Sequence, residues 1–167
     1  METTEFEFDL IFALPDGAAD EAAILDALFA AGCDDAVVGL GQSGLVGLSF
    51  SRAGEEAETV IRGAIADGLR ALPAGARLRE VRPDLVSLAD VAARLGVSRQ
   101  ALQKRDLPPP SLGGLYRARE LGPALTASKG RIADGLGAAR AWLAAAEGAQ
   151  RVNAQMGLAE ASVRIGG

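Results

Sequence analysis

The chain has 167 residues, which is the usual length of one domain or of two small ones. Hydrophobic residues make up 49% of it and charged residues 23%, so it can bury a core and should not be wholly disordered. It has no histidine and one cysteine, Cys33, which excludes Ser-His-Asp and Cys-His catalysis, cysteine-cluster zinc sites and an intrachain disulfide. We therefore expect no enzyme, no cofactor and no metal site.

The sequence also indicates where the protein resides. The first ten residues carry four acidic side chains and no lysine or arginine, which is not the pattern of a signal peptide. No run of 18 apolar residues occurs, so no membrane span is expected. A single thiol fits a reducing compartment. These features predict a soluble, cytoplasmic protein with no membrane partner.

Charge is distributed unevenly along the chain. Residues 1–81 contain 15 acidic and 5 basic side chains, a local net charge of −10, whereas residues 82–134 contain 5 acidic and 9 basic ones, a net charge of +4. Residues 135–167 are nearly neutral. The net charge of −5 argues against nonspecific nucleic-acid binding by the whole surface, but it allows one basic module on an acidic body.

The acidic half predicts alternating strands and helices. Hydrophobic spacing and turn residues indicate strands over 5–14, 36–40, 45–50 and 77–81, and helices over 20–31 and 55–72. The order βαββαβ over about 80 residues is that of a ferredoxin-like fold. We therefore expect an α+β protein that begins with a ferredoxin-like domain over residues 1–82.

Short helices are expected from Pro83 onward. The pattern indicates helices over 88–95, 99–105 and 118–126, an extended stretch over 111–117, and a long C-terminal helix over 132–161. Ser87 and Asp90 form a capping-box pair in front of the first helix. The expected domains are a helix-turn-helix over 83–130 and a C-terminal helix over 131–167.

The C-terminal helix carries a weak heptad stripe, which makes it a possible dimerisation element. The stripe consists of Ile132, Leu136, Ala139, Leu143, Ala146, Gln150 and Asn153. Trp142 lies beside it, and this side chain is expected either in a dimer interface or against the preceding domain.

Residues 86–107 are the most informative part of the chain. A helix-turn-helix needs a small residue where its helices cross and a turn residue that tolerates positive φ, and Ala92 and Gly96 meet these needs. The apolar residues that would face inward are Val91, Leu95, Val97 and Leu102. The second helix then presents a face without acidic residues, made of Ser98, Arg99, Gln100, Gln103 and Lys104. Such a face suits the major groove of DNA.

At these residues the chain resembles the winged helix-turn-helix of MerR-type and excisionase-like regulators. The resemblance covers residues 84–127 and includes Gly114-Leu115-Tyr116-Arg117, which is similar to the Gly-Tyr-Arg wing of that family. It implies that the second helix lies in the major groove and that Tyr116 and Arg117 contact phosphates. Arg105, where relatives have an apolar residue, and the inserted Leu115 depart from the family pattern. The metal-sensing cysteines of the mercury-type members are missing.

Two other features have simpler interpretations. Residues 39–44 spell GxGxxG, but a strand is expected after them rather than the helix that dinucleotide binding needs, so we interpret them as a hairpin turn. Cys33 has no cationic neighbour in sequence and is expected to be an inert thiol. The helix-turn-helix motif itself has a simpler alternative, an alanine-rich helical hairpin whose polar residues are merely solvated.

The sequence therefore predicts a homodimeric transcriptional regulator that binds double-stranded DNA. In this hypothesis Arg99, Gln100 and Gln103 read base edges. The residues expected to contact phosphates are Ser98, Lys104, Tyr116, Arg117 and Lys129. One alternative is an antitoxin-like or adaptor protein whose acidic N-terminal domain binds a protein partner. Another is a regulator that senses a small molecule.

Overall fold

The computed structural model describes residues 2–17, 20–33, 35–39 and 44–165, without the side chains of 161–165. The N-terminal part contains β1 (Thr4–Ala13), α1 (Glu21–Ala30), β2 (Ala36–Gly39), β3 (Leu45–Gly54), α2 (Ala57–Ala71) and β4 (Arg77–Arg82). The rest contains β5 (Leu85–Val86), α3 (Leu88–Leu95), α4 (Arg99–Gln103), the 3-10 turn η1 (Leu112–Gly114), β6 (Tyr116–Arg117), α5 (Ala118–Thr126) and α6 (Arg131–Ile165). The predicted α+β class is confirmed.

The main sheet has four strands in the order β2-β3-β1-β4, and all neighbouring strands are antiparallel. Its two faces differ because β1 alternates apolar and acidic residues. Phe6, Phe8, Leu10 and Phe12 are at most 4% exposed and form the centre of the first core, whereas acidic residues at 5, 7 and 9 point to the opposite face. The expected alternation therefore sets which face of the sheet is buried.

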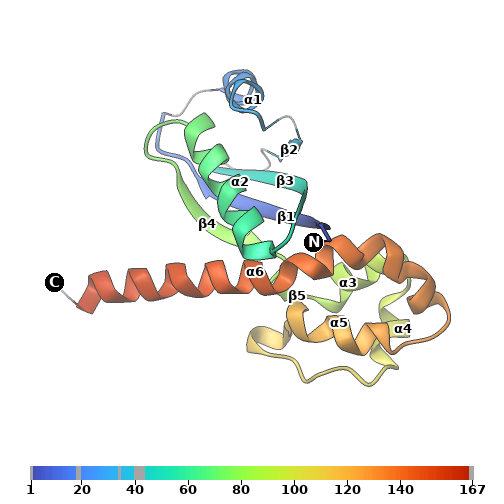
Figure 1. The fold of residues 1–167 in the computed structure, drawn as a ribbon. Helices are drawn as coiled ribbons and strands as arrows, with labels where there is room; N and C mark the ends of the chain where they lie inside the picture. Colours follow the sequence, from blue (N-terminus) through green and yellow to red (C-terminus); the bar gives the residue numbers. More distant parts are fainter. Residues whose placement is uncertain (1, 18–19, 34, 40–43, 166–167) are drawn as a thin grey trace.

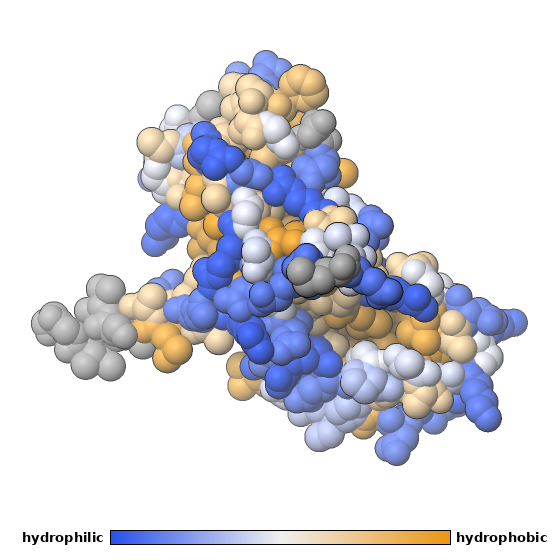
Figure 2. Space-filling model, viewed as in Figure 1, coloured by the Kyte–Doolittle hydropathy of each residue, from blue (hydrophilic) through white to orange (hydrophobic). Residues whose placement is uncertain are grey.

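Helices cover the buried face of this sheet (Figure 1). Ile61 and Ala64 of α2 are fully buried in the first core, which α6 also enters. Helix α1 contributes Ile24 and Leu28, but its Phe29 is 75% exposed. Figure 2 shows hydrophobic residues at the surface over α1.

A second core lies under the short helices, and α6 belongs to both cores. Ile132, Ala139 and Ala146 of α6 pack in the second core, whereas Ala149 and Val152, further along the helix, pack in the first. The predicted heptad stripe therefore packs within the chain rather than forming a free face. Trp142, which is 5% exposed, lies in the second core and stacks under the Arg94 guanidinium at 5.1 Å.

Several predicted boundaries differ from the structure. The helix expected over 99–105 ends at Gln103, and the stretch expected to be extended contains η1, where Gly113 and Gly114 have positive φ. Strand β5 was not predicted, because two residues are too short to show a period. Gly44 leads into a strand rather than a helix, as expected for the GxGxxG segment, although residues 40–43 lie outside the described part.

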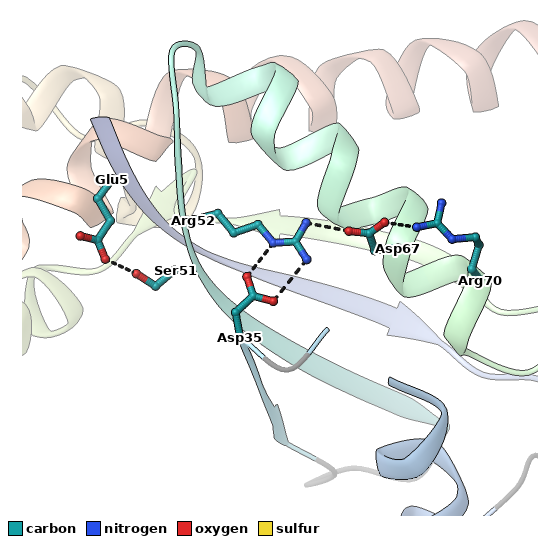
Figure 3. A network of polar contacts seen from close by, with 6 residues as sticks. All are labelled: Glu5, Asp35, Ser51, Arg52, Asp67 and Arg70. Atoms are coloured by element: carbon teal, nitrogen blue, oxygen red, sulfur yellow. Dashed lines mark hydrogen bonds and ion pairs between the residues drawn. The ribbon is translucent and has the colours of Figure 1, made fainter. Parts of the chain in front are cut away.

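Arg52 ties the start of β2 to α2 (Figure 3). Its guanidinium pairs with Asp35 at 2.7 Å and with Asp67 at 2.8 Å, and Asp67 also pairs with Arg70. The hydrogen bond with Asp35 is the main reason that the pKa of Arg52 is raised. Members of this network also lie near the Cys33 thiol.

We expect the Cys33 thiol to react slowly in the folded protein. It is 3% exposed, and burial, with a smaller contribution from the Asp67 carboxylate, raises its pKa. Because the thiolate is the reactive form, labelling by an aromatic disulfide at mildly alkaline pH should be at least about ten-fold slower in the native protein than in urea. Equal rates in the two states would contradict the burial of this thiol.

Two classes of feature are not found among the described residues. No helix there has the length and apolar character that crossing a membrane requires. The same residues contain no group of three or more histidine, cysteine or acidic side chains placed to bind a metal ion.

Candidate nucleic-acid interface

Helix α3 begins and ends at residues that the sequence marked. The Ser87 hydroxyl accepts a hydrogen bond from the Asp90 N–H at 3.1 Å, and the Asp90 carboxylate accepts one from the Ser87 N–H at 3.1 Å, which completes the capping box. Gly96 ends the helix with φ of 67°, a conformation that glycine adopts without strain. Ser98 then begins α4 by accepting a hydrogen bond from the Ala101 N–H at 3.2 Å.

Helix α4 is held to the second core by one side chain. Leu102 is 0% exposed, and it packs among Val91, Ala92 and Leu95, as predicted. The residues expected to face outward all do so. Arg99, Gln100, Gln103 and Lys104 are exposed, together with the capping residue Ser98. The predicted face without acidic residues therefore exists, although the helix has only five residues.

A hollow of about 460 Å³ lies beside this face, and we call it the α4 hollow. It is lined by Arg99 and Gln103 of α4, by Tyr116 of β6, and by Arg105 and the acidic Asp106 from the segment between them. The structure thus brings together three of the predicted site residues. Arg105 also lines the hollow, although in the sequence it stands out only as a departure from the family pattern.

The segment predicted to be a wing is a short antiparallel ribbon that pairs Leu85 with Arg117 and Val86 with Tyr116. Tyr116 packs partly against the second core. Arg117 does not point freely to solvent, since its guanidinium pairs with Asp84 at 2.7 Å. The Asn153 amide of α6 donates to the same carboxylate at 3.0 Å and also bonds both backbone groups of Val81 at 2.8 Å. Through Asp84 and Asn153, Arg117 therefore connects this ribbon to β4 and α6.

We expect Arg117→Ala to lower the free energy of unfolding by about 1–2 kcal/mol. The Asp84 side chain is only 14% exposed, so the loss of its cationic partner leaves a carboxylate short of water and hydrogen bonds. Urea denaturation measures the effect, and Arg119→Ala is the matched control, because Arg119 is exposed and has no ion pair among the described residues. If both variants were equally stable, the pair would have no structural role.

The basic module leaves most of its cations unpaired. Of the nine in residues 82–134, three form ion pairs, namely Arg82, Arg94 and Arg117. The six without a carboxylate partner among the described residues are Arg99, Lys104, Arg105, Arg119, Lys129 and Arg131. Lys129 lies between α5 and α6 and does not line the α4 hollow. The charge excess seen in the sequence is therefore available at the surface, mostly on α4 and at the α5–α6 turn.

No family model, curated protein or solved structure matches this chain.

Proposed function

We propose that the protein binds double-stranded DNA and regulates transcription by occupying its site. The observation that carries the proposal is the exposed face of α4, where four donor or cationic side chains stand together without an acidic residue among them. Leu102 fixes the direction of this face. A helix placed in this way suits the donor and acceptor pattern of the major groove.

Apart from Ser98, which caps α4, each side chain of the face has a role in this proposal. Arg99, Gln100 and Gln103 read base edges, since arginine pairs bidentately with guanine and glutamine with adenine. Tyr116 and Arg105, which line the α4 hollow, contact phosphates there, and the exposed Lys104 contacts phosphate from outside the hollow. Arg117 is given a supporting role in place of phosphate contact, because Asp84 already engages it.

The proposal extends to the identity of the two modules. We infer that residues 83–130 form a winged helix-turn-helix of the MerR and excisionase kind, supported by α3, α4 and the β5–β6 ribbon. We infer that residues 1–82 form a ferredoxin-like domain, supported by the element order and by the strand order β2-β3-β1-β4.

A homodimer remains part of the proposal, although the heptad stripe is engaged within the chain. A five-residue helix contacts few base pairs, so two copies on neighbouring half-sites would multiply the affinity. The dimer contact then involves surfaces other than the stripe.

The test is selection of bound sequences from a pool of random duplexes, followed by fluorescence anisotropy on the enriched duplex across a salt series. We expect log affinity to fall linearly with log salt concentration, because phosphate contacts release counterions. Arg99→Ala should weaken binding to the enriched duplex by about 1–3 kcal/mol and relax the preference at one base position.

Arg79→Ala is the matched control for this variant. Arg79 is an exposed cation of β4 with no ion pair in the described part of the chain, so its loss removes the same charge away from α4. Its affinity should stay within about 0.5 kcal/mol of the wild type. The proposal fails if no sequence is enriched, or if the two variants bind equally well.

A further inference from the structure

A groove of about 810 Å³ lies where the sheet meets the helix-turn-helix, and we call it the junction groove. Strands β1 and β4 contribute Asp9 and Glu80, and helices α3 and α6 contribute Arg94 and Trp142. It shares no lining residue with the α4 hollow. Its volume falls in the range of small-molecule sites in proteins. The groove is therefore distinct from the proposed DNA-binding face.

One side of the junction groove is apolar. Val86 and Trp142 line it and are each 5% exposed, and Leu115 lies with them at the base of the wing. Apolar side chains of this kind contact the body of a ligand.

The charged residues of the groove are not balanced. Both of its cations already have partners, since Arg82 pairs with Glu80 at 2.5 Å and Arg94 pairs with Glu7 at 2.7 Å. The Asp90 carboxylate is used in the capping box of α3.

Asp9 differs from these groups. It lies half-buried on β1 and has no hydrogen bond or ion pair within the described chain. Among the charged groups that line the groove, it is thus a carboxylate left without a partner.

We propose that the junction groove binds an organic amine with an apolar body. The ammonium group donates hydrogen bonds to the Asp9 carboxylate, and the body packs against Val86, Leu115 and Trp142. An anion is disfavoured, because both arginines are engaged and the unpaired charge is negative. This inference does not depend on DNA binding.

The test uses three probes of equal size and different charge: phenylbutylammonium, phenylbutanol and phenylbutyrate. Trp142 is the single tryptophan of the chain and lines the groove, so its emission reports binding directly. We expect a saturable change with the amine, at an affinity about ten-fold above that for the alcohol, which is about 1.4 kcal/mol. The carboxylate probe should bind most weakly.

Three variants test whether this result comes from the groove. Asp9→Asn keeps the shape of the side chain and should abolish the preference for amine over alcohol, whereas Glu55→Gln removes an exposed carboxylate that does not line the groove and should leave the preference unchanged. Ala93→Phe fills the groove from the surface of α3 and should weaken all three probes. Thermal unfolding shows whether each variant is folded. Equal affinity for amine and alcohol, or an unchanged preference in Asp9→Asn, overturns the proposal.

Discussion

We expect Gly135→Ala to lower the free energy of unfolding by at least about 2 kcal/mol, although alanine is normally the better helix residue. A Cβ atom at this position of α6 would lie 2.1 Å from the Leu95 carbonyl oxygen and 2.9 Å from its carbonyl carbon. These are backbone atoms at the end of α3, so no side-chain rotation relieves the overlap. The two helices must move apart, which disturbs the second core around Leu95 and Ile132. Urea denaturation measures the loss.

Gly137→Ala is the control for this variant. It lies two residues further along the same helix, and a Cβ atom there meets nothing within 4 Å. The substitution should raise the free energy of unfolding by about 0.5–1 kcal/mol through helix propensity alone. Opposite signs for the two variants are expected. Equal stability would show that α3 and α6 do not cross as closely as the structure has them.

The glycines of α6 explain how this one helix packs in both cores. At Gly148 a Cβ atom would lie 2.7 Å from the Glu58 backbone nitrogen, so α2 also approaches α6 too closely there for a side chain, although less closely than α3 does at Gly135. The sequence presents these glycines only as interruptions that weaken a helix. Whether such a glycine allows a close helix crossing depends on which helix lies opposite, and the spacing of apolar residues does not show this.

In the rest of the fold, too, features set by residues close in sequence were predictable and features set by long-range contacts were not. Strand β1 was predictable because Phe6, Phe8 and Leu10 alternate with acidic residues, and α3 because Ser87 and Gly96 mark its ends. These are signals between residues that are close in sequence. Whether the heptad stripe packs within the chain or in a dimer interface was not predictable, because both require the same apolar spacing.

The candidate interface was also predictable only in part. The inward position of Leu102 determines which residues of α4 face outward, so that face could be predicted from helical geometry. The ion pair between Arg117 and Asp84 joins residues 33 positions apart. Nothing local indicates it, because a wing arginine bound to phosphate and one bound to a carboxylate look alike in sequence. The sequence likewise does not show that Asp9 lacks a partner, because only the structure shows which nearby charged groups pair with one another.

Leu102→Ala should cost about 2–5 kcal/mol of stability, the usual range for a leucine truncated in a core. Leu102 is 0% exposed and is the one buried residue of α4, so the truncation both opens a cavity and removes the anchor of the helix. The proposed DNA-binding face would lose its fixed direction. We therefore expect binding to the selected duplex to fall by more than about ten-fold under conditions in which the rest of the chain remains folded.

Leu102→Met separates the two effects, because methionine nearly conserves the volume and should cost less than about 1.5 kcal/mol. It should keep most of the DNA affinity, since α4 remains docked against Val91 and Leu95. Denaturation and anisotropy on the same three proteins make the comparison. A Leu102→Ala protein that was destabilised yet bound DNA as tightly as the wild type would show that the contact to DNA is made elsewhere, and would assign the exposed cations of α4 to solvent.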